Sequence, residues 1–149
     1  MADLVKVLIE LGDDTWHEFE TESLWAEYMK ETTFRIMNSP FFAYGLSVGD
    51  EVEVSVDDEV PRFSKVVRRS GHSTFRLLNT ASLGTSDFIK NAQGLSALGC
   101  SLEHASFGFE LISVDVRPAL HLSDVKRVLL SDVDKDHWSY EDACIQHSS

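Results

Sequence analysis

The sequence predicts a small α+β protein: a small antiparallel β-barrel or curled sheet, followed by a β-α-β-β-α ferredoxin-like half. Two observations support this class. The first 79 residues consist of short segments with alternating apolar and polar residues, separated by turn-forming residues, as in antiparallel strands. Two later segments then show apolar residues at helical spacing. At 149 residues the chain suffices for one domain or two small ones. We place a soft boundary between an acidic β-rich part, residues 1–71, and an α+β part, residues 72–149.

Six strands are expected before residue 80. The alternation predicts them at residues 5–11, 22–29, 32–38, 52–56, 62–70 and 73–79. Pro40, Gly45 and the pair Gly49–Asp50 predict a turn-rich connection before the fourth strand. Short strands separated by turns are typical of a small barrel or a strongly curled sheet. Trp25 lies within the alternation of the second strand, so we expect it in the core.

The first helix is expected at residues 85–99. Phe88, Ala92 and Leu95 belong to its apolar side, Thr85 or Ser86 can cap its start, and Gly99 suits its end. With residues 73–79 as the preceding strand, it begins the α+β half of the chain.

A hairpin around Phe107–Gly108 and a second helix from about Ser123 complete the predicted order. Val125 and Leu129 lie on one side of this helix. Residues 132–143 carry aspartates at calcium-loop spacing but lack the required glycine and glutamate. We therefore interpret them as a solvated helix end and tail. Two helices would then cover one face of an antiparallel sheet.

The negative charge is concentrated in the first two-fifths of the chain. Residues 1–60 contain 15 Asp and Glu against Lys6, Lys30 and Arg35, which gives −12, whereas residues 61–149 contain ten residues of each sign. Such a field repels nucleic acid and anionic membrane, and it accelerates association with basic proteins. No segment approaches the ~20 apolar residues of a membrane span, and the N-terminus does not resemble a signal peptide. We expect a cytoplasmic protein with reduced cysteines.

The acidic N-terminal part is the first candidate site. Glu18, Glu20 and Glu22 alternate, so in an extended chain they would share one face and repel each other unless a cation meets them. No ligand pattern predicts a metal or a cofactor. A solvated acidic face remains an alternative to a surface for a basic protein, with aromatic anchors among the acids. The predicted partner-binding residues are Trp16, Glu18, Glu20, Glu22, Glu27, Phe41, Phe42, Tyr44, Asp50, Glu51, Asp57, Asp58 and Glu59.

The segment RRSGHST, residues 68–74, is the second candidate site. Arg68, Arg69 and His72 lie in the only basic neighbourhood of the chain, where backbone N–H groups at the Gly71 turn could bind an anion. The same arginines could simply pair with the N-terminal acids. No nucleophile motif accompanies His72, so we do not expect an enzyme. A small-molecule-binding enzyme or sensor domain that uses these three residues is the alternative function.

Four segments in order, WHEFETESLWAE, NSPFFAYGLSVGDEVEV, VVRRSGHSTFRLL and LSALGCSLEHA, resemble a family of small bacterial proteins catalogued as a domain of unknown function. The resemblance covers residues 5 to 140. Its characteristic blocks are ESLWAE (22–27), PFFAYG (40–45) and RSGHST (69–74). It implies an immunity protein that stands beside a polymorphic antibacterial toxin, including toxins of the Rhs type. The expected partner is therefore a cognate toxin with a basic active-site cleft, and the expected role is inhibition by binding.

Overall fold

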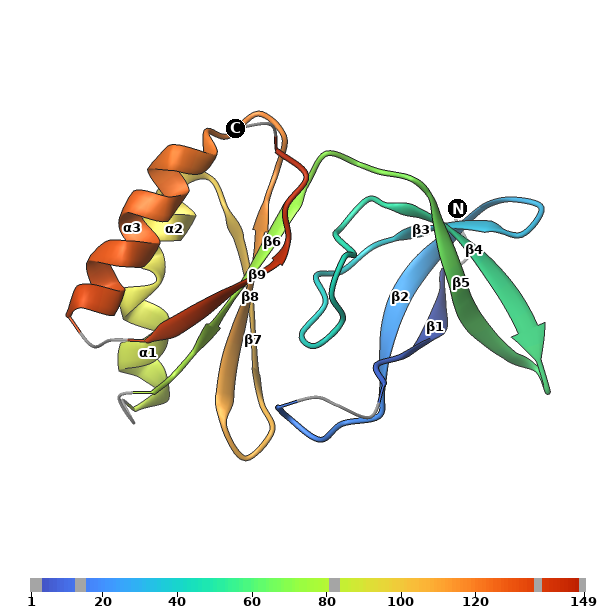
Figure 1. Cartoon of the computed structure of the whole chain (residues 1–149), viewed down its shortest axis with the longest axis horizontal. Helices are drawn as coiled ribbons and strands as arrows, with labels where there is room; N and C mark the ends of the chain where they lie inside the picture. The colour runs from blue at the N-terminus through green and yellow to red at the C-terminus, as the bar shows by residue number, and fades with distance from the viewer. Residues whose placement is uncertain (1–3, 13–15, 81–83, 136–137, 148–149) are drawn as a thin grey trace.

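The computed structural model confirms a small α+β protein built mostly from antiparallel sheets. Figure 1 shows two units side by side, a strand-only unit and a sheet with helices on its outer face. The predicted boundary at residue 71 falls between them, in the connection from Arg68 to Ser73. The structure describes residues 4–12, 16–80, 84–135 and 138–147, without the side chains of residues 132–134.

The first unit is a closed barrel in the order β1-β2-β3-β4-β5. A short parallel contact between Leu8 and Arg62 joins the first strand to the last. The inward positions form an apolar core that includes Val7, Leu24 and Val52, because successive side chains of a strand point to opposite faces. The strands are β1 (Leu4–Glu10), β2 (Thr21–Lys30), β3 (Thr33–Ile36), β4 (Glu51–Asp57) and β5 (Val60–Arg68).

The predicted core position of Trp25 is wrong. Its neighbours Leu24 and Ala26 are the buried residues of β2, and Trp25 is 46% exposed. The period of the strand was predicted correctly, but its inward face was not. On the outer face the ammonium group of Lys6 lies 5.2 Å from the centroid of the Trp25 ring, a cation–π contact.

The second unit contains a four-stranded sheet in the order β7-β8-β6-β9. All its strand pairs are antiparallel. Its elements in chain order are β6 (Ser73–Leu78), α1 (Thr85–Asn91), α2 (Gln93–Leu98), β7 (Ser101–Ser106), β8 (Glu110–Val116), α3 (Leu122–Asp134) and β9 (Ser139–Cys144). The predicted hairpin around Phe107–Gly108 is confirmed as the β7–β8 connection.

Strand β9 is absent from the predicted order, and the interpretation of residues 132–143 as a solvated tail is wrong. Residues 139–144 pair with β6 along most of its length. The acids Glu141 and Asp142 make this segment look like surface, although Ala143 and Cys144 beside them are buried. The calcium-like aspartates fall outside the described side chains and residues.

The single helix predicted at residues 85–99 is two helices that meet at Ala92. Gly84 stands at the first N-cap position without a side-chain hydrogen bond, so the capping by Thr85 or Ser86 is wrong. The ending is confirmed, because Gly99 is the C-cap in the left-handed region at φ 108°. Phe88, Ala92 and Leu95 are buried as predicted, and so are Val125 and Leu129 of α3.

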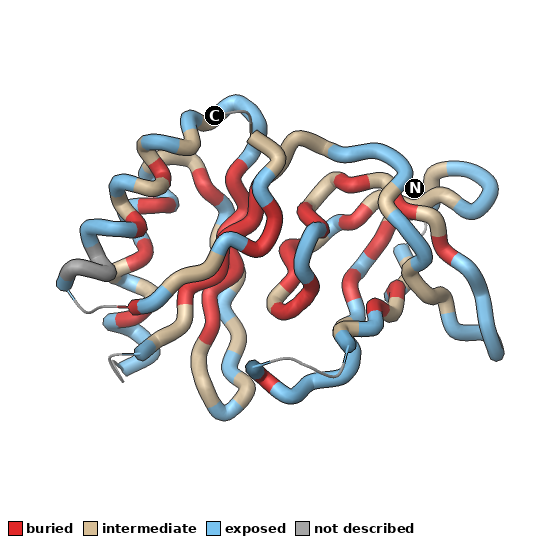
Figure 2. The backbone as a smooth tube through the Cα atoms, viewed as in Figure 1, coloured by how far each residue is buried: buried red, intermediate tan, exposed pale blue. Residues whose placement is uncertain are grey.

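The sheet has two chemically different faces. Phe75 and Leu77 of β6 belong to the apolar cluster that includes residues of all three helices. The intervening residues Thr74 and Arg76 therefore point to the opposite face, toward the barrel. Figure 2 shows that the connection between β3 and β4, which lies against this face, is largely buried. We call this connection, residues 37–50, the joint loop, because it lies between the two units.

Candidate functional site

The joint loop is held on its barrel side by a carboxylate. Glu22 of β2 accepts hydrogen bonds from the backbone N–H groups of Phe41 (2.6 Å), Phe42 (3.0 Å) and Ala43 (2.9 Å). Three converging N–H donors satisfy an ionised carboxylate without any cation. The oxygens of Glu22 are used inside the fold, and its role in partner binding stays a prediction.

On its sheet side the same loop is held by a guanidinium group. Arg76 of β6 is 1% exposed and donates to the carbonyl oxygens of Pro40 (3.4 Å), Phe42 (3.2 Å) and Ala43 (2.7 Å). Its Nε donates to Glu141 of β9 at 2.8 Å. The loop therefore presents its N–H groups to an anion from the barrel and its carbonyl oxygens to a cation from the sheet.

Tyr44 and Asp50 are also part of this joint rather than free surface. The hydroxyl of Tyr44 donates to Glu141, and the Arg76 guanidinium lies 4.7 Å from its ring centroid. Asp50 is fully buried and accepts from the N–H groups of Ser47 (3.0 Å) and Ser70 (2.9 Å). Burying Asp50 removes it from any partner surface, so that prediction is wrong. The Tyr44 side chain is exposed but already tied by its hydroxyl.

Two more of the predicted acids are paired within the barrel. Glu27 lies 3.7 Å from Arg35 and Glu51 lies 3.8 Å from Arg68, and both carboxylates are largely covered. Glu22 and Asp50, which accept backbone N–H groups, are likewise engaged within the fold. The anionic surface is therefore smaller than the sequence predicts.

Three exposed acids lie where β1 ends and β2 begins: Glu10, Glu18 and Glu20. Glu20 extends the β1–β2 ladder, since its carbonyl accepts from the N–H of Leu11 at 2.9 Å, and it lines the same hollow as Glu10. Arg62 of β5 lies 3.3 Å from Glu10 and 4.0 Å from Asp57 of β4. We call this surface the acidic end. It comprises Glu10, Glu18 and Glu20. Asp57, Asp58 and Glu59 of the β4–β5 turn are exposed too, but they lie at the opposite ends of the strands, on the side of the β2–β3 turn.

The prediction that Glu18, Glu20 and Glu22 share one strand face is wrong. Strand β2 begins at Thr21, and Glu18 has a positive φ of 63°, so the chain turns before the strand. Glu18 and Glu20 point to solvent without an ion-pair partner among the described residues. Glu10, which the sequence did not single out, joins them because β1 ends opposite Thr21.

An aromatic cluster lies beside the acidic end and connects both units. Its rings are Trp16, His17, Phe19, Phe41, Phe42, Phe107 and Phe109. Trp16 is 47% and Phe19 38% exposed, whereas Phe42 is buried beneath them. Trp16 contacts Phe109 of the β7–β8 hairpin, at 5.2 Å between ring centroids. The sequence did not identify Phe107 and Phe109, because only the tertiary fold brings the hairpin to this place.

His17 lies inside this cluster in its neutral form. Its ring centroid is 4.3 Å from that of Phe42, and its Nδ1 accepts from the N–H of Phe19 at 2.9 Å. The proton of the neutral ring is then on Nε2, which is buried and has no hydrogen-bond partner within the described part of the chain. Burial, and after it the charge of Arg76, lowers the pKa of His17 below its usual value.

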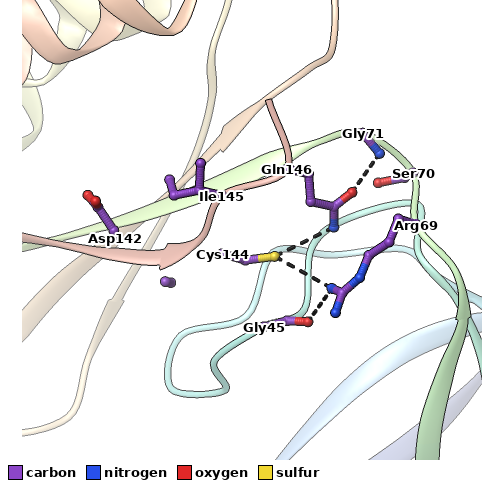
Figure 3. A pocket seen from close by; sticks show the side chains of 9 residues that line it. Gly45, Arg69, Ser70, Gly71, Asp142, Cys144, Ile145 and Gln146 are labelled. Atoms are coloured by element: carbon purple, nitrogen blue, oxygen red, sulfur yellow. Dashed lines mark hydrogen bonds between the residues drawn. The ribbon is translucent and has the colours of Figure 1, made fainter. Parts of the chain in front are cut away.

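The residues of the second candidate site do not converge. Arg68 pairs with Glu51, and Arg69 donates to the carbonyl oxygen of Gly45 at 2.6 Å. His72 lies against Asp115, with its Nδ1 2.8 Å from Oδ1. The cavity in Figure 3, about 670 Å³ in volume, is lined by Arg69 with Cys144 and Gln146, but by neither Arg68 nor His72. The three residues have separate structural partners.

Both cysteines are free and buried, as expected for reduced thiols. Burial, and after it the charge of Asp115, raises the pKa of Cys100 to about 11. Among the residues that the structure describes, no three His, Cys, Asp or Glu side chains are grouped to hold a metal ion. In the same part of the chain no helix has the length and apolarity to cross a membrane.

Residues 22–140 match a protein family described as a domain of unknown function, DUF4265. The fold is similar to that of a hypothetical protein from Neisseria gonorrhoeae whose crystal structure is known. The TM-score is 0.72 at 22% sequence identity, and the alignment covers 99% of this chain and 98% of that chain. At this identity the similarity establishes the fold alone. No curated protein matches the chain significantly.

Proposed function

The chain belongs to the DUF4265 family, and we propose that it is an immunity protein, which binds a cognate antibacterial toxin and blocks it without catalysis. The proposal joins the resemblance of the sequence to immunity proteins with one observation on the surface. Residues 16–20 present two exposed aromatic rings, Trp16 and Phe19, beside the carboxylates of Glu18 and Glu20, which have no ion-pair partner among the described residues.

This arrangement suits recognition of a basic protein for two reasons. Tryptophan is among the residues that most often dominate the binding energy of interfaces, and Trp16 is fixed in position by its contacts with Phe42 and Phe109. A side chain held before binding loses less entropy on association. The surrounding carboxylates attract a positively charged surface and accelerate the encounter.

The partner's chemistry follows from the acidic end. A toxin that acts on nucleic acids or nucleotides keeps a cationic cleft for phosphate groups, and an anionic protein surface can occupy that cleft in place of the substrate. Glu10, Glu18 and Glu20 lie together where β1 ends and β2 begins, whereas the β4–β5 turn with Asp58 and Glu59 lies at the opposite ends of the strands. We place the inhibitory surface at the acidic end, in a cytoplasmic protein.

The alternative, an enzyme or sensor that works through Arg68, Arg69 and His72, has less support. Two of these side chains are paired with N-terminal acids or the joint loop, and the third with Asp115. A shared substrate would require all three to reach one cavity.

The proposal is tested by co-expression in a bacterial host with the polypeptide encoded directly upstream of this chain's gene. We expect that polypeptide to stop growth alone and to be tolerated with the wild-type chain. The double variant Glu18→Lys/Glu20→Lys should lose protection, because it places four units of positive charge change at the acidic end.

The matched control is Glu31→Lys/Asp87→Lys, which changes the net charge equally at exposed positions outside the acidic end. It should protect like the wild type. An upstream product that is harmless, or whose toxicity the wild-type chain does not change, refutes the immunity function. Equal protection by both double variants refutes the assigned surface.

A further inference from the structure

A small cavity lies between the joint loop and the sheet, and none of the residues that line it belongs to the aromatic cluster. Its volume is about 200 Å³, less than the ~300–1,000 Å³ of sites that bury a whole drug-sized ligand. A single side chain or a small molecule would fill it. The wall residues used below are Met37, Ser39 and Val48 from the joint loop, Ser101 and Glu103 from β7, and Asp115 from β8.

Two carboxylates share this cavity because of the strand register. Ser101 faces Asp115 and Glu103 faces Ser113 across the β7–β8 pair. Glu103 and Asp115 are therefore diagonal neighbours on the same face, close enough for long side chains to reach one ligand.

Each carboxylate has one oxygen in use and one oxygen free. Glu103 Oε2 accepts from the N–H of Ser39 at 2.7 Å, and Asp115 Oδ1 lies 2.8 Å from His72 Nδ1. Glu103 Oε1 and Asp115 Oδ2 have no hydrogen-bond partner within the described part of the chain. They are also not among its fully enclosed unpartnered atoms, which are those of His17 and Arg62. The free oxygens therefore keep access to the cavity.

The pair lacks a permanent cation. Asp115 is only 8% exposed, and neither carboxylate forms an ion pair with a lysine or arginine among the described residues. Burial is the first cause that raises the pKa of both groups, and the charge of Asp115 adds to it at Glu103. Buried carboxylates in proteins are normally paired, because an uncompensated buried charge is costly. A bound cation would remove this cost.

We propose that the cavity binds the cationic end of an organic ligand, an alkylguanidinium or alkylammonium group. Glu103 Oε1 and Asp115 Oδ2 accept its N–H donors, and Met37 and Val48 contact its methylene groups. Guanidinium matches best, since its fixed fork of donors can reach two acceptors at once. The group can belong to a free amine or to an arginine or lysine side chain of a protein. This inference does not depend on the immunity function.

The test is titration of the whole chain with ethylguanidinium and with N-acetyl-arginine methylamide, followed by amide chemical shifts in NMR spectra. We expect saturable shifts around Ser39, Glu103 and Asp115. The citrulline analogue of the arginine derivative, equal in shape but neutral, should cause none. Equal affinity of both cations indicates a small free ligand, and tighter binding of the arginine derivative indicates a protein side chain. Both results support the cation site.

The variants Glu103→Gln and Asp115→Asn should each weaken binding about tenfold or more, because each removes a charged hydrogen-bond acceptor. Glu53→Gln, which changes an exposed barrel acid paired with Lys65, should bind as the wild type does. If Asp115→Asn does not fold, Glu103→Gln decides alone. The proposal is overturned if neither cation gives saturable shifts, if the citrulline analogue binds equally well, or if Glu103→Gln binds like the wild type.

Discussion

Replacing Arg76 by methionine should destabilise the protein strongly, because this side chain holds the joint loop against the sheet. Methionine keeps most of the apolar length but removes the donors to three carbonyl oxygens and to Glu141. Breaking a buried pair by removing one partner costs about 3–5 kcal/mol. Glu141 is 31% exposed at its side chain and can regain water, so the lower end, about 3 kcal/mol, applies.

Thermal unfolding followed by tryptophan fluorescence measures this loss. For a chain of this size about 3 kcal/mol corresponds to a decrease in Tm of about 6–12 °C. Arg127→Met is the matched control, because its guanidinium is 77% exposed and 3.4 Å from Asp124 on the same helix. A pair of this kind contributes about 0.5 kcal/mol or less. If Arg76→Met lowers the Tm no more than Arg127→Met does, the account of the joint is wrong.

Two further predictions concern buried titratable groups. The folded protein disfavours the charged form of His17, whose pKa is lowered by burial and by Arg76, against the raising effects of Glu141 and Glu22. The stability that the neutral His17 contributes is therefore fully present above the pKa of histidine in the unfolded chain, about 6.5. It is lost as the pH falls below that pKa. Between pH 7.5 and pH 5.5 the urea midpoint should fall more in the wild type than in His17→Phe, and equal falls would contradict this. Burial raises the pKa of Cys100 to about 11, so Cys100 should resist iodoacetamide at pH 8 in the native protein and react in urea. Mass spectrometry of the peptide that contains Cys100 measures the labelling. Equal labelling rates in the two conditions would disprove the protection.

Most strands and helices could be predicted from the sequence because they depend on the spacing of apolar residues along the chain. The strands with β-branched residues and the helix ending at Gly99 were predicted close to their observed places. Trp25 shows the limit, since alternation identifies a strand but not which of its faces is inside. Strand β9 was missed because Glu141 and Asp142 make it resemble a solvated segment. Glu141 is tolerated there since its partner Arg76, far away in the sequence, lies in the adjacent strand.

The candidate site was less predictable, because it depends on contacts between distant residues. Glu22 is as acidic as Glu20 in the sequence, yet its partners are backbone N–H groups about twenty residues away, which no side-chain pattern reveals. Asp50 was expected at the surface and is enclosed by the joint. Trp16 and Glu20 remain exposed, and their role in binding stays a prediction.

The residues of the chain differ in whether they hold the joint loop in place. The ESLWAE block supplies Glu22, the PFFAYG block is the bound loop, and the RSGHST block supplies Ser70, which holds Asp50. All three blocks of the resemblance therefore meet at the same place, between the units. Residues 16–20 and the β4–β5 turn provide none of the hydrogen bonds that hold the loop. Substitutions of the exposed residues Glu18 and Glu20 therefore leave the hydrogen bonds of the joint intact, whereas substitution of Glu22 or Asp50 removes some of them.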